Sequence, residues 1–185
     1  MTKGNGDLQC IDKFKPAITT VLYNTYVNVV GNHLSGLLII KQMPDSSLRL
    51  VFSSETGFKF FDFEFSQNNF KVHYIINKMN RKSVIKTLRK DFELVLMNNL
   101  NFADGYILKS DSNNYYTFPS GKDHYYYITD PACKELLWME RGSKKKKVTE
   151  AVAKDYKGSI ADSISIKHTG FEFEIGLKRI INYAE

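Results

Sequence analysis

The stretch that decides the fold is LSGLLIIKQMPDSSLRLVFSSETGFKFFDFEFSQNNFKVHYII, residues 34–76. Apolar and polar residues alternate through most of it, and turn residues such as Pro44-Asp45-Ser46 and Glu55-Thr56-Gly57 interrupt the alternation. Alternation with a period of two, broken by turns about every dozen residues, is typical of antiparallel strands. Residues 19–30 alternate in the same way, so residues 19–76 predict a meander of five strands.

One strand of this meander changes its apolar face. Phe58 and Phe60 lie on one face, whereas Phe61, Phe63 and Phe65 lie on the other. A change of face within one strand predicts a bulge or a strong bend near Phe60-Phe61, because an extra residue reverses the alternation. Asp62 and Glu64 share the face of Phe58 and Phe60. They are read either as a strand end in water or as two carboxylates flanking a cleft.

After the meander the period changes from 2 to 3.6. Residues 81–98 carry apolar side chains along one stripe and basic side chains opposite, which predicts an amphipathic helix that covers the sheet. Further strands are expected over residues 105–110, 115–118, 124–129, 134–140, 146–153, 159–167 and 171–177. We therefore expect a single mainly β domain over residues 1–185, with 1–16 as a loose lead-in. Its architecture is a curved antiparallel sheet or half-open β-barrel meander, lidded by the helix.

The composition fits a globular domain with a mild basic bias. The chain has 185 residues, 14% aromatic residues and a net charge of +6. At this length folding buries roughly 70% of the surface of the unfolded chain, so no metal or disulfide is required for a core. The positive charge suits an anionic partner, but it serves solubility equally well.

The sequence offers few signals for chemistry. The four histidines are isolated, and no spacing typical of a metal site, nucleophile elbow or phosphate loop occurs. We therefore expect no enzyme, no catalytic residue, no metal and no cofactor. Cys10 and Cys133 are too far apart in sequence to form a motif, and whether they pair depends on the fold.

Four consecutive basic residues, Lys144, Lys145, Lys146 and Lys147, are the sharpest charge feature. They are expected at an exposed hairpin tip, either as a solvated loop or as a contact with anionic lipid headgroups. Binding of nucleic acid by stacking needs aromatic residues interleaved with the basic ones. The nearest aromatic residues, Trp138 and Tyr156, are several positions away, so no nucleic-acid partner is expected.

Two predicted strands, residues 34–42 and 58–65, are apolar on both faces. A sheet with one solvated face alternates cleanly, so this surplus indicates either an apolar cavity or a barrel filled by its own side chains. The residues expected to line such a cavity are Leu38, Ile40, Phe58, Phe60, Tyr74, Leu88 and Phe92.

The order of these elements resembles the LolA/LolB-like lipoprotein carriers. The resemblance lies in LSGLLIIKQMPDSSLRLVFSSETGFKFFDFEF (34–65), NNFKVHYII (68–76) and the amphipathic helix, and it is clearest over residues 34–96. It implies an open antiparallel half-barrel that is lidded by helices and holds the acyl chains of lipoproteins in an apolar cavity.

Two hypotheses follow. The first is a monomeric carrier of the bacterial envelope that binds an acyl chain, lipid or lipoprotein and contacts an anionic membrane surface. It would act in the periplasm or at the periplasmic face of the outer membrane. The segment 1–9 has no apolar signal-peptide core, so a cytoplasmic location is expected if Met1 is the native start. The second hypothesis is a non-catalytic interaction module with a filled β-barrel core.

Overall fold

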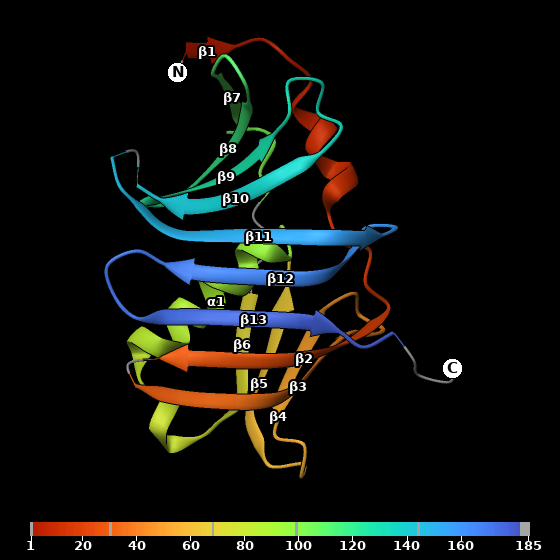
Figure 1. Ribbon diagram of the computed structural model, residues 1–185, viewed down its shortest axis with the longest axis vertical. Helices are drawn as coiled ribbons and strands as arrows, with labels where there is room; N and C mark the ends of the chain where they lie inside the picture. Colours follow the sequence, from red (N-terminus) through yellow and green to blue (C-terminus); the bar gives the residue numbers. More distant parts are fainter. Residues whose placement is uncertain (1, 30, 68, 99, 144, 182–185) are drawn as a thin grey trace.

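The computed structural model describes residues 2–29, 31–67, 69–98, 100–143 and 145–181. In these residues the chain forms one antiparallel sheet of 13 strands (Figure 1). The strands are β1 (Thr2–Gly4), β2 (Thr20–Val29), β3 (Asn32–Gln42), β4 (Leu48–Ser53), β5 (Lys59–Ser66), β6 (Asn69–Ile75), β7 (Tyr106–Lys109), β8 (Asn114–Ser120), β9 (Asp123–Thr129), β10 (Leu136–Gly142), β11 (Lys147–Lys157), β12 (Ile160–His168) and β13 (Phe173–Arg179). The helices are η1 (Leu8–Phe14), η2 (Asn77–Met79) and α1 (Lys82–Val95).

The sheet consists of two meanders joined by one long-range strand pair. Strands β2 to β6 form the predicted five-stranded meander, and β7 to β13 form a second one with the seven strands expected after the helix. Strand β13 pairs with β2, for example Leu177 with Thr25, so the two meanders form one sheet whose edges are β1 and β6. The predicted antiparallel, open and mainly β architecture is therefore confirmed.

The lead-in is more ordered than the sequence suggested. Residues 2–4 form strand β1 beside β7, and residues 8–14 form the helix η1. The Asp7 side chain accepts a hydrogen bond from the Gln9 N–H (2.9 Å) and so caps η1. Periodicity did not indicate β1, because three residues are too few for an alternating pattern.

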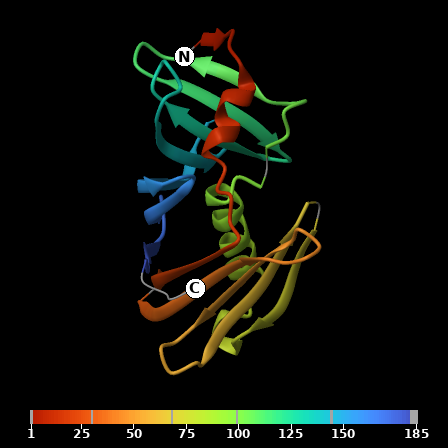
Figure 2. The ribbon, with the colours of Figure 1, turned by 90° about the vertical axis from the view of Figure 1, so that its right-hand side faces the viewer.

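Helix α1 lies inside the curve of the sheet. Strands β7–β10 lie on one side of it and β3–β6 on the other (Figure 2). The helix ends at Val95, three residues before the predicted end, because Met97 adopts a left-handed backbone (φ 54°). The N–H groups of Met97 and Asn98 then bond to the carbonyls of Leu94 and Glu93. This pair of bonds is the usual closing motif of a helix C-terminus.

The bulge predicted near Phe60-Phe61 is present. Phe52 pairs with Phe61 and Ser53 with Lys59, so Phe60 is the extra residue. Phe60 and Phe61 are both buried and both contact Phe52, at ring-centre distances of 4.8 and 5.5 Å. The bulge therefore turns both side chains inward, and the outer face of β5 carries Asp62 and Glu64.

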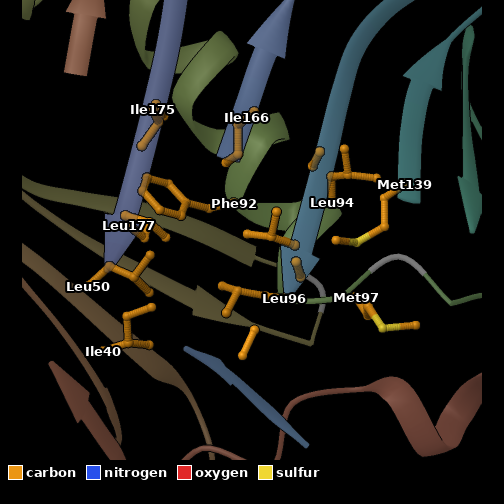
Figure 3. Packing of buried hydrophobic residues seen from close by; sticks show 14 of the residues in the cluster. Ile40, Leu50, Phe92, Leu94, Leu96, Met97, Met139, Ile166, Ile175 and Leu177 are labelled. Atoms are coloured by element: carbon orange, nitrogen blue, oxygen red, sulfur yellow. The ribbon is translucent and has the colours of Figure 1, made fainter. Parts of the chain in front are cut away.

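The core fills the space between α1 and the sheet. Side chains from β3, β4, β10, β12, β13 and α1 meet there (Figure 3). Leu88 and Phe92 of α1 are 0% and 1% exposed. Full burial of one such side chain contributes about 1.5–3 kcal/mol, so the helix is held by packing rather than by its own propensity.

A disulfide joins the lead-in to the second meander. Cys10 in η1 and Cys133 in the turn between β9 and β10 form the bond across 123 sequence positions. The Lys13 ammonium also donates to the Cys133 carbonyl. The sequence alone did not show whether Cys10 and Cys133 pair, and the structure shows that they do.

Loss of the disulfide should lower stability. The double substitution Cys10→Ser and Cys133→Ser should reduce the free energy of unfolding by about 4 kcal/mol, because the bond restricts a long loop of the unfolded chain. Urea unfolding followed by tryptophan fluorescence measures this, and reduced wild-type protein should match the variant. An identical midpoint with and without reductant would show that the bond does not form.

Candidate functional site

Strands β10 and β11 are paired over only part of their length. These strands pair from Met139↔Ala151 to Gly142↔Lys147, and no pairing continues toward Leu136. Figure 1 shows the two strands diverging toward the end where β10 begins. We call this opening the seam; its walls are residues 136–138 of β10 and 152–156 of β11. A hollow of about 750 Å³ lies in the seam, with Phe14 of η1 in its lining.

Behind the seam lies an apolar crevice of about 30 Å³. The seam and the crevice share Phe14, Leu136, Ala153, Tyr156 and Ser159 in their linings. The deeper lining includes Ile40, Leu96, Met97, Met139 and Leu177. About 30 Å³ is the volume that one water molecule occupies in the liquid, so the interior is filled in this state.

The segment that connects η1 to β2 closes one end of the crevice. We call residues 15–18 the strap. Its Pro16 and Ile18 line the crevice, and the Ala17 N–H donates to Ser159 Oγ at 2.9 Å. The disulfide holds the strap at one end and strand β2 holds it at the other. The strap is thus a tethered cover.

The groups around the seam suit binding better than acid–base chemistry. Its rim carries Lys13, Lys134, Glu135, Lys154 and Asp155, and its interior is apolar. Partial burial raises the pKa of Tyr156, which is 37% exposed, to about 12, so this hydroxyl stays protonated at neutral pH. The site can therefore bury an apolar group below a polar rim.

The structure brings together five of the seven predicted ligand-binding residues. Leu38, Ile40, Phe60, Leu88 and Phe92 belong to one buried cluster, and of these Ile40 also lines the crevice.

Phe58 and Tyr74 are outside this buried cluster, 57% and 43% exposed, although the centre of the Phe58 ring lies 5.7 Å from that of the Phe60 ring. Phe58 lies in the turn before β5. Tyr74 of β6 is the cross-strand neighbour of Asp62, whose side chain faces outward. Whether any of the seven contacts a ligand stays a prediction. The sequence did not indicate the seam, because the point at which two strands stop pairing leaves no pattern in the local sequence.

The predicted membrane-contact lysines are at the opposite end of β10 from the seam. Lys144 is outside the described residues. Lys145 and Lys146 are exposed, whereas Lys147 is paired with Glu150 at 2.6 Å and with Glu140 at 3.4 Å. The hairpin tip is therefore confirmed as exposed, and its contact with a membrane stays a prediction.

A buried polar cluster that the sequence did not predict anchors α1 to the second meander. Asp91 of α1 is 0% exposed; it lies 2.7 Å from His168 Nε2 and 3.5 Å from Arg141 Nη2. Arg141 also donates to Thr149 Oγ1 at 2.7 Å. One signal was present, because Asp91 interrupts the apolar stripe beside Leu88 and Phe92. Within the described part of the chain, no group of three or more His, Cys, Asp or Glu side chains is arranged to hold a metal ion.

Asp62 and Glu64 are ion-paired side chains within β5 rather than a solvated strand end. Asp62 is 5% exposed and accepts hydrogen bonds from Arg49 Nη2 and Lys59 Nζ, both at 3.1 Å. Glu64 lies 3.6 Å from Arg49 and 2.7 Å from His73. Burial alone would raise the pKa of Asp62, but the hydrogen bonds and charges of Arg49 and Lys59 outweigh it and lower the pKa.

The comparisons with known proteins do not assign a family. No family model matches the chain, and no curated protein matches it. Among solved structures, the chain is similar to a DUF1329 family protein from Desulfovibrio piger, with a TM-score of 0.46 and 9% sequence identity. The alignment covers 94% of this chain and 89% of that chain. No helix in the described part of this chain combines the length and apolarity needed to cross a membrane. The LolA/LolB-like resemblance therefore stays a prediction.

Asp62 should stabilise the fold in a pH-dependent way. Its folded pKa is below the unfolded value of about 4, so its contribution is present above that value and is lost as pH falls through the folded pKa. Asp62→Asn should lower the free energy of unfolding by about 2 kcal/mol at neutral pH, and this difference should shrink as the pH falls below the unfolded pKa and through the lower folded pKa. Urea unfolding at neutral and at low pH tests this, with the exposed Asp12→Asn as control. A difference that is unchanged at low pH would contradict an ionic contribution.

Proposed function

We propose that this protein is a non-catalytic carrier that takes an acyl chain of a lipid or lipoprotein through the seam into the interior. The observation that supports the proposal is the opening between β10 and β11, which leads directly to an apolar crevice. Through this opening an apolar chain would reach the core between two strands.

Binding requires the interior to repack, because the crevice of about 30 Å³ is far smaller than an acyl chain. Its lining favours repacking. Met97 and Met139 have flexible thioether side chains, which fill irregular space and readily adopt new rotamers. Phe14 and Tyr156 lie at the outer margin, half-buried and exposed respectively, so they can move outward without breaking the core.

Burial of the chain would supply the driving force. Each buried methylene contributes about 0.8 kcal/mol, so ten methylenes supply about 8 kcal/mol before association and repacking costs are subtracted. The charged rim of the seam remains available to a polar headgroup. We therefore expect micromolar rather than nanomolar affinity.

The disulfide supports a location in the bacterial envelope. Structural disulfides persist in oxidising compartments and are rare in the reducing cytosol. The Cys10–Cys133 bond thus favours the periplasm or the periplasmic face of the outer membrane over the cytoplasm. The proposal further includes a monomer, and a lipid surface as the source of the ligand.

A second function is favoured by the filled interior. A protein whose core is occupied by its own side chains is also suited to be an interaction module, with partners bound on its outside. In that case the seam would be a local irregularity of the sheet and no apolar ligand would enter.

Titration with dansyl-labelled undecanoic acid distinguishes these functions. Wild-type protein should bind it saturably, and Ala153→Phe, which fills the shared lining of seam and crevice, should weaken binding at least about tenfold. Met139→Ala should not weaken binding, because it enlarges the crevice. Phe171→Ala is the matched control, since Phe171 is 45% exposed and follows β12 at the end of that strand away from the seam.

Phe60→Ala separates the seam from the site that the sequence predicted. Because Phe60 is buried against Phe52, its loss should lower the free energy of unfolding by about 3 kcal/mol and leave ligand affinity unchanged. Weakened binding in a stable Phe60→Ala variant would instead place the ligand near β5. No binding by wild-type protein, together with a lipid-free mass in native mass spectrometry, would overturn the carrier proposal.

A further inference from the structure

The outer face of the sheet carries a groove of about 670 Å³ that shares Val152 and Lys154 with the lining of the seam and otherwise lies mainly on β12, β13, β2 and β3. Two neighbouring rows of cross-strand partners form it. The first row runs Lys154, Ser163, Lys178 and Asn24, from β11 to β2. The second row runs Val152, Ser165, Gly176, Tyr26 and Ser35, from β11 to β3. Side chains alternate across a strand, so these rows face away from Ala153, Leu177 and Tyr23, which face the core.

Tyr26 provides a flat aromatic surface in this groove. A Cβ atom on Gly176 would lie 2.1 Å from Tyr26 Cε1, so the ring covers the glycine backbone directly. The Tyr26 hydroxyl donates to Glu174 Oε1 at 3.2 Å, which fixes the ring. The residue is 36% exposed, so the ring remains accessible from solvent.

Two lysines in the groove lack acidic partners. Lys154 and Lys178 are exposed, and neither lies within ion-pair distance of an acidic side chain in the described residues. The nearby Lys167, in contrast, is paired with Glu174 at 3.3 Å. Ser163 is the cross-strand partner of Lys154 on one side and of Lys178 on the other. The Cα atoms of the two lysines are therefore separated by two strand spacings, about 10 Å. Two lysine side chains across this distance can share one anionic group, with the Ser163 hydroxyl beneath it.

The other residues that line the groove indicate which kind of anionic molecule fits it. Ser35, Ser163, Ser165 and Asn24 supply hydroxyl and amide groups that both donate and accept hydrogen bonds, as a polyhydroxylated ligand requires. Glu174 beside Tyr26 and Glu55 in the groove lining place negative charge away from the lysines. A ligand with one anionic group fits this distribution, whereas a chain of phosphates would meet the carboxylates.

We propose that this groove binds an acidic saccharide. One face of the sugar ring stacks on Tyr26, its phosphate or carboxylate lies between Lys154 and Lys178, and its hydroxyls bond to the serines and Asn24. The site is on the opposite face of the sheet from the core and shares only Val152 and Lys154 with the lining of the seam, so it does not depend on the entry of an acyl chain. The Ala153→Phe variant, which blocks the seam, should bind the saccharide normally.

NMR titration of the ¹⁵N-labelled protein with N-acetylglucosamine 6-phosphate tests the proposal. Amide shifts should change in β2, β12 and β13. Tyr26→Ala and Lys178→Met should each weaken binding at least about fivefold, since the first removes the aromatic surface and the second removes one of the two lysines that bind the anion. Lys71→Met is the matched control, because Lys71 is an exposed lysine of the same sheet outside the groove.

Gly176→Ala tests the aromatic surface without removing it. The added Cβ would displace the end of the Tyr26 side chain, so affinity should fall to the level of Tyr26→Ala while the thermal midpoint changes little. Unmodified N-acetylglucosamine should bind more weakly than the phosphorylated sugar. Equal affinity for inorganic phosphate, tighter binding of adenosine monophosphate, or no shift changes in these strands would each overturn the proposal.

Discussion

The pairing of β13 with β2 is the contact on which the rest of the structure depends. It joins the end of the chain to its first long strand, from Phe173↔Val29 to Arg179↔Tyr23. Without it the two meanders would each have a further open edge, and neither would enclose α1. With it, one curved sheet has an inner face, which packs on the helix, and a continuous outer face. The crevice belongs to the first face and the saccharide groove to the second.

The strength of the connections around α1 differs from place to place. Asp91 holds the helix to β10 and β12 through Arg141 and His168, and a buried ionic cluster of this kind is costly to disrupt. The disulfide holds η1 to the turn before β10. Next to these fixed points, β10 and β11 part, and only side chains and the strap separate the core from solvent there. Local opening is expected where backbone pairing is missing, so the seam is the part of the sheet suited to move.

The sequence allowed prediction of what local periodicity encodes. Alternation gave the strands of both meanders, the 3.6 period gave α1, and the change of face at Phe60-Phe61 gave the bulge. The β13–β2 pairing, the disulfide and the seam could not be predicted, because each depends on residues that are far apart in the chain. The early end of α1 was missed for a different reason. Met97 adopts a left-handed conformation that is unusual for its residue type, and its sequence neighbours do not reveal it.

The apolar surplus that first suggested a cavity has a different explanation in each strand. In β5 the bulge turns Phe60 inward with Phe61, so the strand is one-sided after all and its outer face is ionic. In β3 the second apolar face is real, because Ile39 points outward, is 40% exposed, and aligns with Leu22 and Val51 on the neighbouring strands. Neither strand therefore needs an internal cavity to account for its composition. The case for a carrier rests instead on where the sheet is unpaired, which is a property of the fold rather than of its residue content.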